Sequence, residues 1–160
     1  MKKTIQSFEV DHNRLQRGLY VSRKDAVGSE TVTTFDIRVK VPNRPPFLGT
    51  AGSHTIEHLG AVFLRNHPDW GSRIVYFGPM GCRTGFYLLA AGDLSSEEIA
   101  PLITAMFIHI RDYSGTIPGT TSVECGNYQD HDLEDARAES KTYLEEVLLQ
   151  LTKETTEYPR

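Results

Sequence analysis

Two histidines that stand one helical turn apart constrain this chain more than any other feature. His54 and His58 are four residues apart, and Glu57 directly precedes the second, in the order H-x-x-E-H. Positions i and i+4 of an α-helix share one face, so both imidazoles can bind one metal ion and Glu57 can reach the edge of the same site. The spacing predicts a helix with a catalytic transition-metal site. The alternative is a pair of structural histidines on an amphipathic helix.

The composition indicates a protein with one ordinary core. The chain has 160 residues, of which 39% are apolar and 24% charged, enough for a single domain. The net charge of −4, without a basic block, argues against a nucleic-acid partner. The longest apolar stretch, 99–110, is too short to span a bilayer, so we expect no membrane partner.

The N-terminal segment predicts a cytoplasmic location. Residues 1–7 carry positive charge, but no apolar segment of the kind found in signal peptides follows them. In the cytoplasm, Cys82 and Cys125 should be thiols or metal ligands rather than a disulfide.

Alternation of apolar and polar residues predicts an antiparallel sheet. The clearest strand is 35–41, in which one face is apolar and the other polar, so Arg38 should point away from the core. Further strands are expected at 73–77 and 86–91, and a short one at 19–21.

Helical periodicity predicts three helices. The first carries the histidine pair, with Ser53 as its N-cap, and should end by His67 because Pro68 follows. The second begins with a capping box at Ser95, and the third covers 133–151. The order of elements predicts one α+β domain spanning 1–160, an antiparallel sheet with helices packed on one side.

The histidine pair leaves a third metal ligand to be found. Catalytic zinc or iron sites usually have three protein ligands and one open position. Spacing cannot choose among residues that meet only in the fold, and a thiolate suits borderline-soft metals well. The candidates are Cys82, Cys125, His12, His109 and His131.

Six sequence blocks together resemble the S-ribosylhomocysteine lyases, the LuxS family. They occur in the family's order between residue 7 and about residue 134, and the set is far more specific than any one block. The blocks are SFEVDH at 7–12, FDIR at 35–38, PN at 42–43, HTIEHL at 54–59, PMGCRTG at 79–85 and ECG at 124–126.

The resemblance implies a metal site and an acid–base pair. His54, His58 and Cys125 would hold Fe²⁺, which Zn²⁺ or Co²⁺ can replace, and Glu57 and Cys82 would transfer protons. It also implies a homodimer with two active sites at its interface.

The resemblance further implies the substrate and the residues that contact it. The matching positions are Ser7, His12, Arg38 and Gly126. The enzyme would cleave the thioether of S-ribosylhomocysteine to homocysteine and 4,5-dihydroxy-2,3-pentanedione, the precursor of autoinducer-2. Its roles would be quorum sensing and salvage in the methyl cycle.

The chain departs from the family pattern at two places. Tyr76-Phe77-Gly78 stands where the family usually has Asp-x-Ser, and Ser53 stands where a hydrophobic residue usually precedes the first metal histidine. We expect Tyr76 to lie at the homocysteine end of the substrate, where the family places a carboxylate.

The expected chemistry explains why such groups are needed. The sugar carbonyl must migrate from C1 to C2 and then to C3 before the C–S bond can break by β-elimination. Each migration passes through an enediolate that a metal can stabilise, while Cys82 and Glu57 move protons between carbons. The alternatives are an H-x-x-E-H metallopeptidase, in which Glu57 activates water, and a non-catalytic module with a closed four-ligand site.

Overall fold

The computed structural model describes residues 4–159. Residues 1–3, which carry the positive charge of the N-terminal segment, and Arg160 fall outside this range. The elements are α1 (Gln6–Glu9), β1 (Gly18–Val27), β2 (Glu30–Arg38), α2 (Thr50–Arg65), the 3₁₀ turn η1 (Gly71–Arg73), β3 (Ile74–Pro79), β4 (Gly85–Ala91), α3 (Ser96–Asp112), α4 (Leu133–Glu146), the 3₁₀ turn η2 (Leu148–Gln150) and α5 (Lys153–Thr156).

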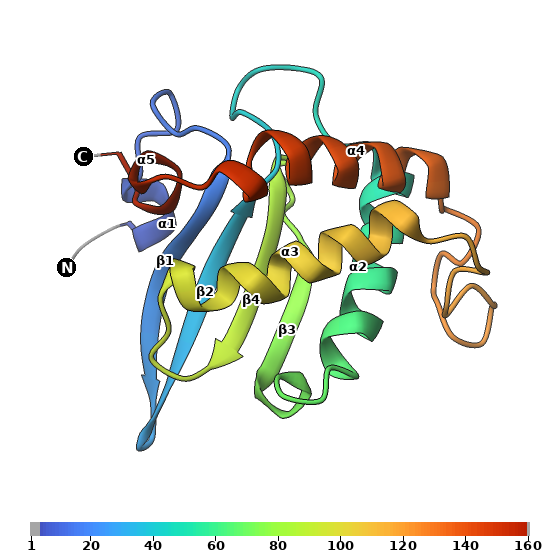
Figure 1. The fold of residues 1–160 in the computed structure, drawn as a ribbon, viewed down its shortest axis with the longest axis horizontal. Helices are drawn as coiled ribbons and strands as arrows, with labels where there is room; N and C mark the ends of the chain where they lie inside the picture. The colour runs from blue at the N-terminus through green and yellow to red at the C-terminus, as the bar shows by residue number, and fades with distance from the viewer. Residues whose placement is uncertain (1–3, 160) are drawn as a thin grey trace.

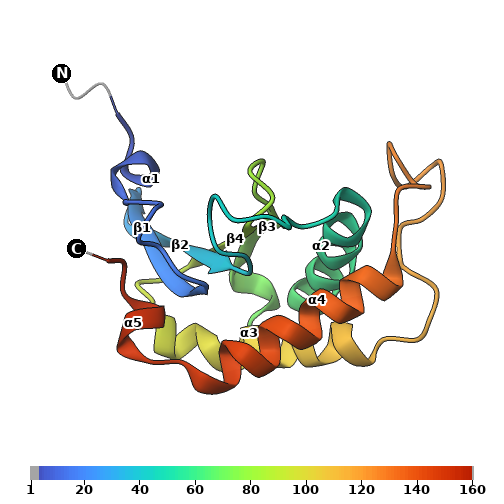
Figure 2. The same cartoon turned by 90° about the horizontal axis from the view of Figure 1, so that it is seen from above.

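The architecture is an antiparallel sheet with helices on one face, so the predicted α+β class is confirmed. The strand order is β1-β2-β4-β3, and every neighbouring pair is antiparallel. Helices α3 and α4 lie side by side across one face of the sheet (Figures 1 and 2). Helix α2 packs beside them against β3, and the core fills the space between these helices and the sheet.

Helix α3 forms as its sequence predicts. The Ser95 side chain accepts a hydrogen bond from the backbone N–H of Glu98, and the Glu98 carboxylate accepts one from Ser95 N–H. The apolar stripe that follows is fully buried against the sheet and α4, as shown by Ile103, Phe107 and Ile110.

Helix α2 begins earlier than predicted, which corrects the assignment of Ser53 as its N-cap. Gly49 caps the helix, and the Ser53 backbone N–H already donates to the Gly49 carbonyl inside the first turn. Gly52 is needed here, because a β-carbon at this position would overlap the carboxylate of Asp135 on α4. The helix ends at Arg65, before Pro68, as predicted.

Arg38 lies on the face of β2 opposite Phe35 and Ile37, away from the apolar core as predicted, but this polar face is buried and not open to solvent. Asp36 and Arg38 are only 1% and 3% exposed. Tyr158 from the C-terminal segment contacts Asp36, and Thr84, which directly precedes β4, contacts Arg38. Together they cover this face of the strand. Alternation of apolar and polar residues identified the strand, but it did not show that other residues cover its polar face.

None of the helices within residues 4–159 combines the length and apolar character needed to cross a bilayer. The most apolar one, α3, carries charged residues at both ends.

Candidate metal centre and acid–base site

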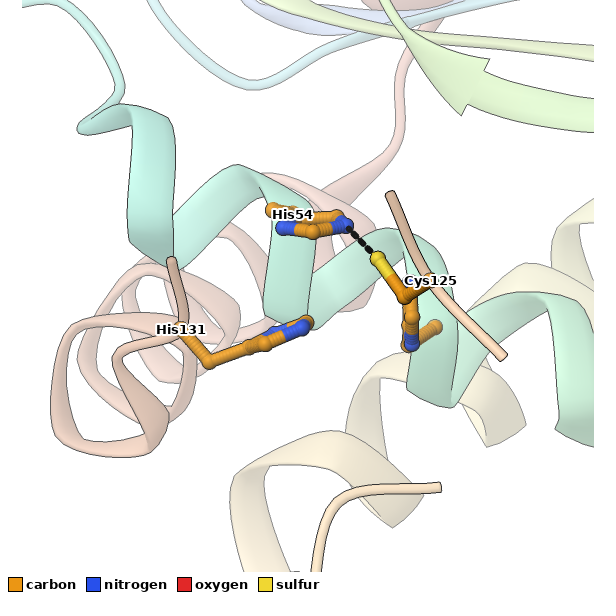
Figure 3. A group of neighbouring side chains, drawn as sticks. His54, Cys125 and His131 are labelled. Carbon is orange, nitrogen blue, oxygen red and sulfur yellow. Dashed lines mark hydrogen bonds between the residues drawn. The ribbon is translucent and has the colours of Figure 1, made fainter. Parts of the chain in front are cut away.

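Four nitrogen and sulfur ligands converge beside α2. His54 and His58 project from this helix, while Cys125 and His131 come from the long segment between α3 and α4. One potential ligand atom from each of the four residues lies within 4.8 Å of those of the other three. Figure 3 shows Cys125 facing His54, with 3.5 Å between Sγ and Nε2, and His131 beneath the His54 ring. The helical spacing and this segment therefore build one cluster.

Backbone carbonyls fix the orientation of both α2 histidines. His54 Nδ1 lies 2.9 Å from the carbonyl oxygen of Asp130, and His58 Nδ1 lies 2.8 Å from that of Pro118. A carbonyl only accepts, so each Nδ1 carries the proton and each Nε2 keeps a free lone pair. Metal-binding histidines show this arrangement, because a bond on the far nitrogen fixes the tautomer and the ring orientation.

His131 is held in the same tautomer by a side chain of α2. Its Nδ1 lies 3.1 Å from Thr55 Oγ1, whose own proton points to the Ala51 carbonyl at 2.9 Å. His131 Nδ1 is then the donor, and Nε2 is a buried lone pair without a hydrogen-bond partner among residues 4–159. Burial, followed by the proximity of His54 and His58, lowers the pKa of His131.

The ring geometry separates His131 from the other histidines. Its ring stacks on His54 with 4.1 Å between centroids and 21° between planes, whereas His54 and His58 meet at 88°. Imidazole binds a metal in the plane of its ring, so two stacked rings cannot direct their lone pairs at one ion. Together the four side chains offer three nitrogen donors and one sulfur donor, a set that suits Fe²⁺ or Zn²⁺.

The other candidates for the third ligand lie elsewhere. His12 Nδ1 donates a hydrogen bond to the Val10 carbonyl oxygen at 2.8 Å. The His109 ring packs between Phe63 and Tyr113. Cys82 lies in the β3–β4 turn, outside the cluster. The structure thus leaves Cys125 and His131 of the five.

Glu57 borders a cavity that adjoins the histidine cluster. The cavity has a volume of about 300 Å³ and is lined by Glu57, His58, Ala61, Val62, Pro118 and Gly119. Glu57 is half-buried on α2, one position before His58, as the helical spacing predicts. Glu57 therefore forms part of the lining of this cavity, next to His58.

Cys82 belongs to a second polar cluster. Arg38 Nη1 approaches Cys82 Sγ to 4.0 Å and donates to Thr84 Oγ1 at 2.6 Å, while Sγ and Thr84 Oγ1 are 3.1 Å apart. A cation beside a thiol stabilises the thiolate. That cation is Arg38 from β2, and the sequence neighbour Arg83 is exposed, with a backbone φ of 58°.

Arg38 is itself held by a buried carboxylate. Its Nη2 donates to Asp36 Oδ2 at 2.5 Å, and both side chains are almost completely buried. Burial acts to lower the pKa of Arg38, but the charge and the hydrogen bond of Asp36 offset it, so the net shift is upward. Arg38 therefore remains a cation next to Cys82.

The structure places the remaining predicted substrate residues outside both clusters. Ser7 lies on α1, and His12 lies between α1 and β1. Gly126 is exposed, with open space around its Cα. Tyr76 is 48% exposed on β3, with its hydroxyl folded over Gly78. Within residues 4–159, no hydrogen bond or ion pair joins any of them to the histidine cluster or to Cys82.

Sequence reasoning missed two members of the Cys82 cluster, Asp36 and Tyr158. The polar position of Asp36 in strand 35–41 was visible, but alternation placed it in solvent. Tyr158 gave no signal, because its contact with Asp36 spans 122 residues.

Comparisons with known proteins place this chain in a family. The sequence model of S-ribosylhomocysteinase (LuxS) matches residues 5–154. The chain is 59% identical to the S-ribosylhomocysteine lyase of Phocaeicola vulgatus, over 98% of each chain. It is 52% identical to that of Desulfotalea psychrophila and 55% identical to that of Porphyromonas gingivalis, each over 97% of this chain and 98% of the relative.

Proposed function

The chain belongs to the S-ribosylhomocysteinase (LuxS) family, and from that membership we propose that it is a metal-dependent S-ribosylhomocysteine lyase. The reaction would release homocysteine and 4,5-dihydroxy-2,3-pentanedione and thereby supply the autoinducer-2 precursor. The observation that carries this proposal is the convergence of His54, His58 and Cys125 beside Glu57. The relatives described above are all named lyases, so they do not support the alternative of an H-x-x-E-H metallopeptidase.

We infer that His54, His58 and Cys125 are the metal ligands and that the fourth position stays open. The stacked ring of His131 supports this reading, because it cannot share one ion with His54. Iron is the expected ion, and zinc or cobalt should substitute, as the donor set suits all three. The ion would supply a Lewis acid for the negative charge that develops on the sugar oxygens.

We infer that Glu57 and Cys82 carry the protons. The Arg38 guanidinium favours the Cys82 thiolate, which can remove a proton from a sugar carbon next to a carbonyl. The Glu57 carboxyl group can return a proton at the neighbouring position. In the last step a proton next to the C3 ketone is lost, the C–S bond breaks, and the departing homocysteine thiolate takes up a proton. The sequence of steps is redox-neutral.

A homodimer with shared sites is the assembly that we propose. The Cys82 cluster and the histidine cluster are not joined by a hydrogen bond or an ion pair within residues 4–159, so a second protomer is a natural source of missing substrate contacts. Large apolar side chains that one protomer leaves exposed support an interface, among them Phe8 at 76% and Val123 at 94%. Ser7, His12 and Arg38 would contact the substrate, and Gly126 would line the pocket.

We further propose that residues 1–160 act as one lyase domain in the cytoplasm. Cys82 and Cys125 are both free in the structure, and each needs a reduced sulfur for its role. A reducing compartment keeps both thiols available. Salvage of homocysteine for the methyl cycle and quorum sensing would follow from the two products.

The decisive experiment measures thiol release. Anaerobically purified, iron-loaded protein is incubated with S-ribosylhomocysteine, and free thiol is titrated against a blank without substrate. We expect stoichiometric homocysteine from the wild type and almost none from Cys82→Ala. Cleavage of peptides without thiol release would support the metallopeptidase instead, and inertness toward both substrates would support a metal-binding module.

A further inference from the structure

The C-terminal segment reaches across the polar face of β2. Tyr158 donates its hydroxyl proton to Asp36 Oδ2 at 2.8 Å, and its ring stacks on Tyr20 with 4.9 Å between centroids and 25° between planes. The stack fixes the ring, and the hydrogen bond connects the segment after α5 to β2.

The same carboxylate oxygen also binds the cation that faces Cys82. Asp36 Oδ2 accepts hydrogen bonds from the Tyr158 hydroxyl and from Arg38 Nη2. Arg38 Nη1 donates to Thr84 Oγ1 and lies 4.0 Å from Cys82 Sγ. Asp36 and Arg38 are almost completely buried, so water does not screen these charges as it would at the surface. An unbroken series of contacts therefore links Tyr158 to the thiol.

The charges of this network lie on few groups. Asp36 is the anion, Arg38 the cation, and Cys82 the group that changes charge. The phenols around them are neutral near pH 7, because burial raises the pKa of Tyr20 to about 12 and raises those of Tyr87, Tyr143 and Tyr158. Among residues 4–159, further cations lie near the network: Arg23 acts on Tyr87, Arg17 acts on Tyr143, and Arg83 is exposed next to Cys82.

The position of Tyr158 has a definite electrostatic consequence. A hydrogen bond from the phenol takes up part of the negative charge on Asp36 Oδ2, so the carboxylate neutralises less of the guanidinium charge. More of the positive potential of Arg38 then acts on the Cys82 sulfur. Loss of the phenol proton donor should strengthen the Asp36–Arg38 pair and weaken the attraction between Arg38 and the thiolate.

We propose that Tyr158 is a positioning residue that acts on Cys82 through Asp36 and Arg38, so that the C-terminal segment sets the charge state of the acid–base thiol. The proposal rests on the proposed function only in giving Cys82 its role in proton transfer. It adds a residue that does not itself contact the substrate or the metal centre.

The test measures the thiol directly, in full-length, metal-loaded protein. The rate at which iodoacetamide alkylates Cys82 is measured as a function of pH. Peptide mass spectrometry quantifies the alkylated fraction of Cys82 separately from that of Cys125. Tyr158→Phe keeps the ring stack on Tyr20 and removes only the hydroxyl. We expect its pH midpoint to rise, with the rate at neutral pH falling about threefold for each half unit.

A second variant predicts the opposite sign. Asp36→Asn removes the anion that competes for Arg38, so the midpoint for Cys82 should fall. Tyr113→Phe serves as the matched control, because it also removes one tyrosine hydrogen bond, 2.6 Å to the Thr116 carbonyl, but outside this network. Its midpoint should equal that of the wild type.

Two results would overturn the proposal. One is an unchanged midpoint in Tyr158→Phe with an unchanged melting curve. The other is an upward shift in both Tyr158→Phe and Asp36→Asn, which simple loosening of the site would produce. Should Asp36→Asn fail to fold, the Tyr158→Phe midpoint decides alone. Alkylation needs no turnover, so failure of the proposed lyase reaction would appear separately, as absent thiol release by the wild type.

Discussion

The imidazole rings of His54 and His131 lie face to face, 4.1 Å apart at their centroids, although they come from different parts of the chain. His131 is also tied to α2 through Thr55, one residue after His54. A stacked, hydrogen-bonded neighbour restrains the rotation of the His54 ring. We therefore expect His131 to orient a proposed ligand and not to bind the ion itself.

His131→Ala should weaken metal binding without abolishing it. Loss of a neighbouring group that orients a ligand typically lowers metal affinity about 10–100-fold. Competition with a chelator measures the change, and His109→Ala, which alters a histidine away from the cluster, is the control. Complete loss of metal in His131→Ala would make this residue a ligand and contradict the open fourth position.

The three proposed ligands should behave differently from the acid–base pair. His54→Ala, His58→Ala and Cys125→Ala should each lose stoichiometric metal after dialysis, because no other residue replaces a missing donor. Cys82→Ala and Glu57→Gln should keep the metal and lose about 10²–10⁴-fold in kcat. Elemental analysis and thiol release separate the two classes, and full metal content in Cys125→Ala would remove that residue from the site.

Tyr76→Asp tests the position at which the chain departs from its family. Tyr76 is half exposed, so an aspartate there is not buried and should leave the Tm almost unchanged. A carboxylate can pair with the substrate's ammonium group. A hydrogen bond between charged groups stabilises the complex more than a neutral one, and the difference should lower KM roughly fivefold. Val75→Asp, 46% exposed on the same strand, is the matched control and should leave KM unchanged. Equal effects in both variants would mean that Tyr76 does not face the substrate.

Gly52→Ala should destabilise the fold through a clash with α4. The new β-carbon would overlap the Asp135 carboxylate, and such overpacking costs roughly 1–3 kcal/mol. Thermal unfolding measures the loss, and adding Asp135→Ala to the same chain should restore most of it. A Gly52→Ala protein as stable as the wild type would show that α4 shifts freely.

Asp135→Asn should stabilise the protein at neutral pH and not in acid. Burial, and then the charges of Glu139 and Asp132, raise the pKa of Asp135. The folded state therefore binds this proton more tightly than the unfolded state, so ionisation costs stability above the folded pKa and costs nothing below the unfolded pKa. The Tm gain of Asp135→Asn should shrink as the pH falls. A gain that is independent of pH would exclude an electrostatic cause.

The sequence predicted those parts of the site that depend on local geometry. His54, Glu57 and His58 belong to one helix, so their mutual placement follows from the helical repeat alone. Cys125 and His131 could only be candidates, because their place beside α2 depends on the path of the segment after α3. That path involves contacts across 71 and 76 residues.

The fold class followed from periodicity, but the burial of Arg38 did not. Alternation reports which face of β2 is apolar, and it holds for Phe35 and Ile37. It cannot report that the opposite face is covered by a residue from the other end of the chain, since Tyr158 lies 122 residues from Asp36. The prediction of Ser53 as the N-cap was wrong for a similar reason. The first turn of α2 packs against Asp135 of α4, a helix distant in sequence, and Gly52 leaves room for this contact.

The segment between α3 and α4 contributes four groups to the centre: the Pro118 and Asp130 carbonyls that orient the two α2 histidines, the Cys125 sulfur and the His131 ring. A cation bound there would act as a removable crosslink between this segment and α2. Each tenfold rise in free ion above its Kd would then add about 1.4 kcal/mol to the free energy of unfolding. The melting temperature of the protein would thus report the concentration of free metal.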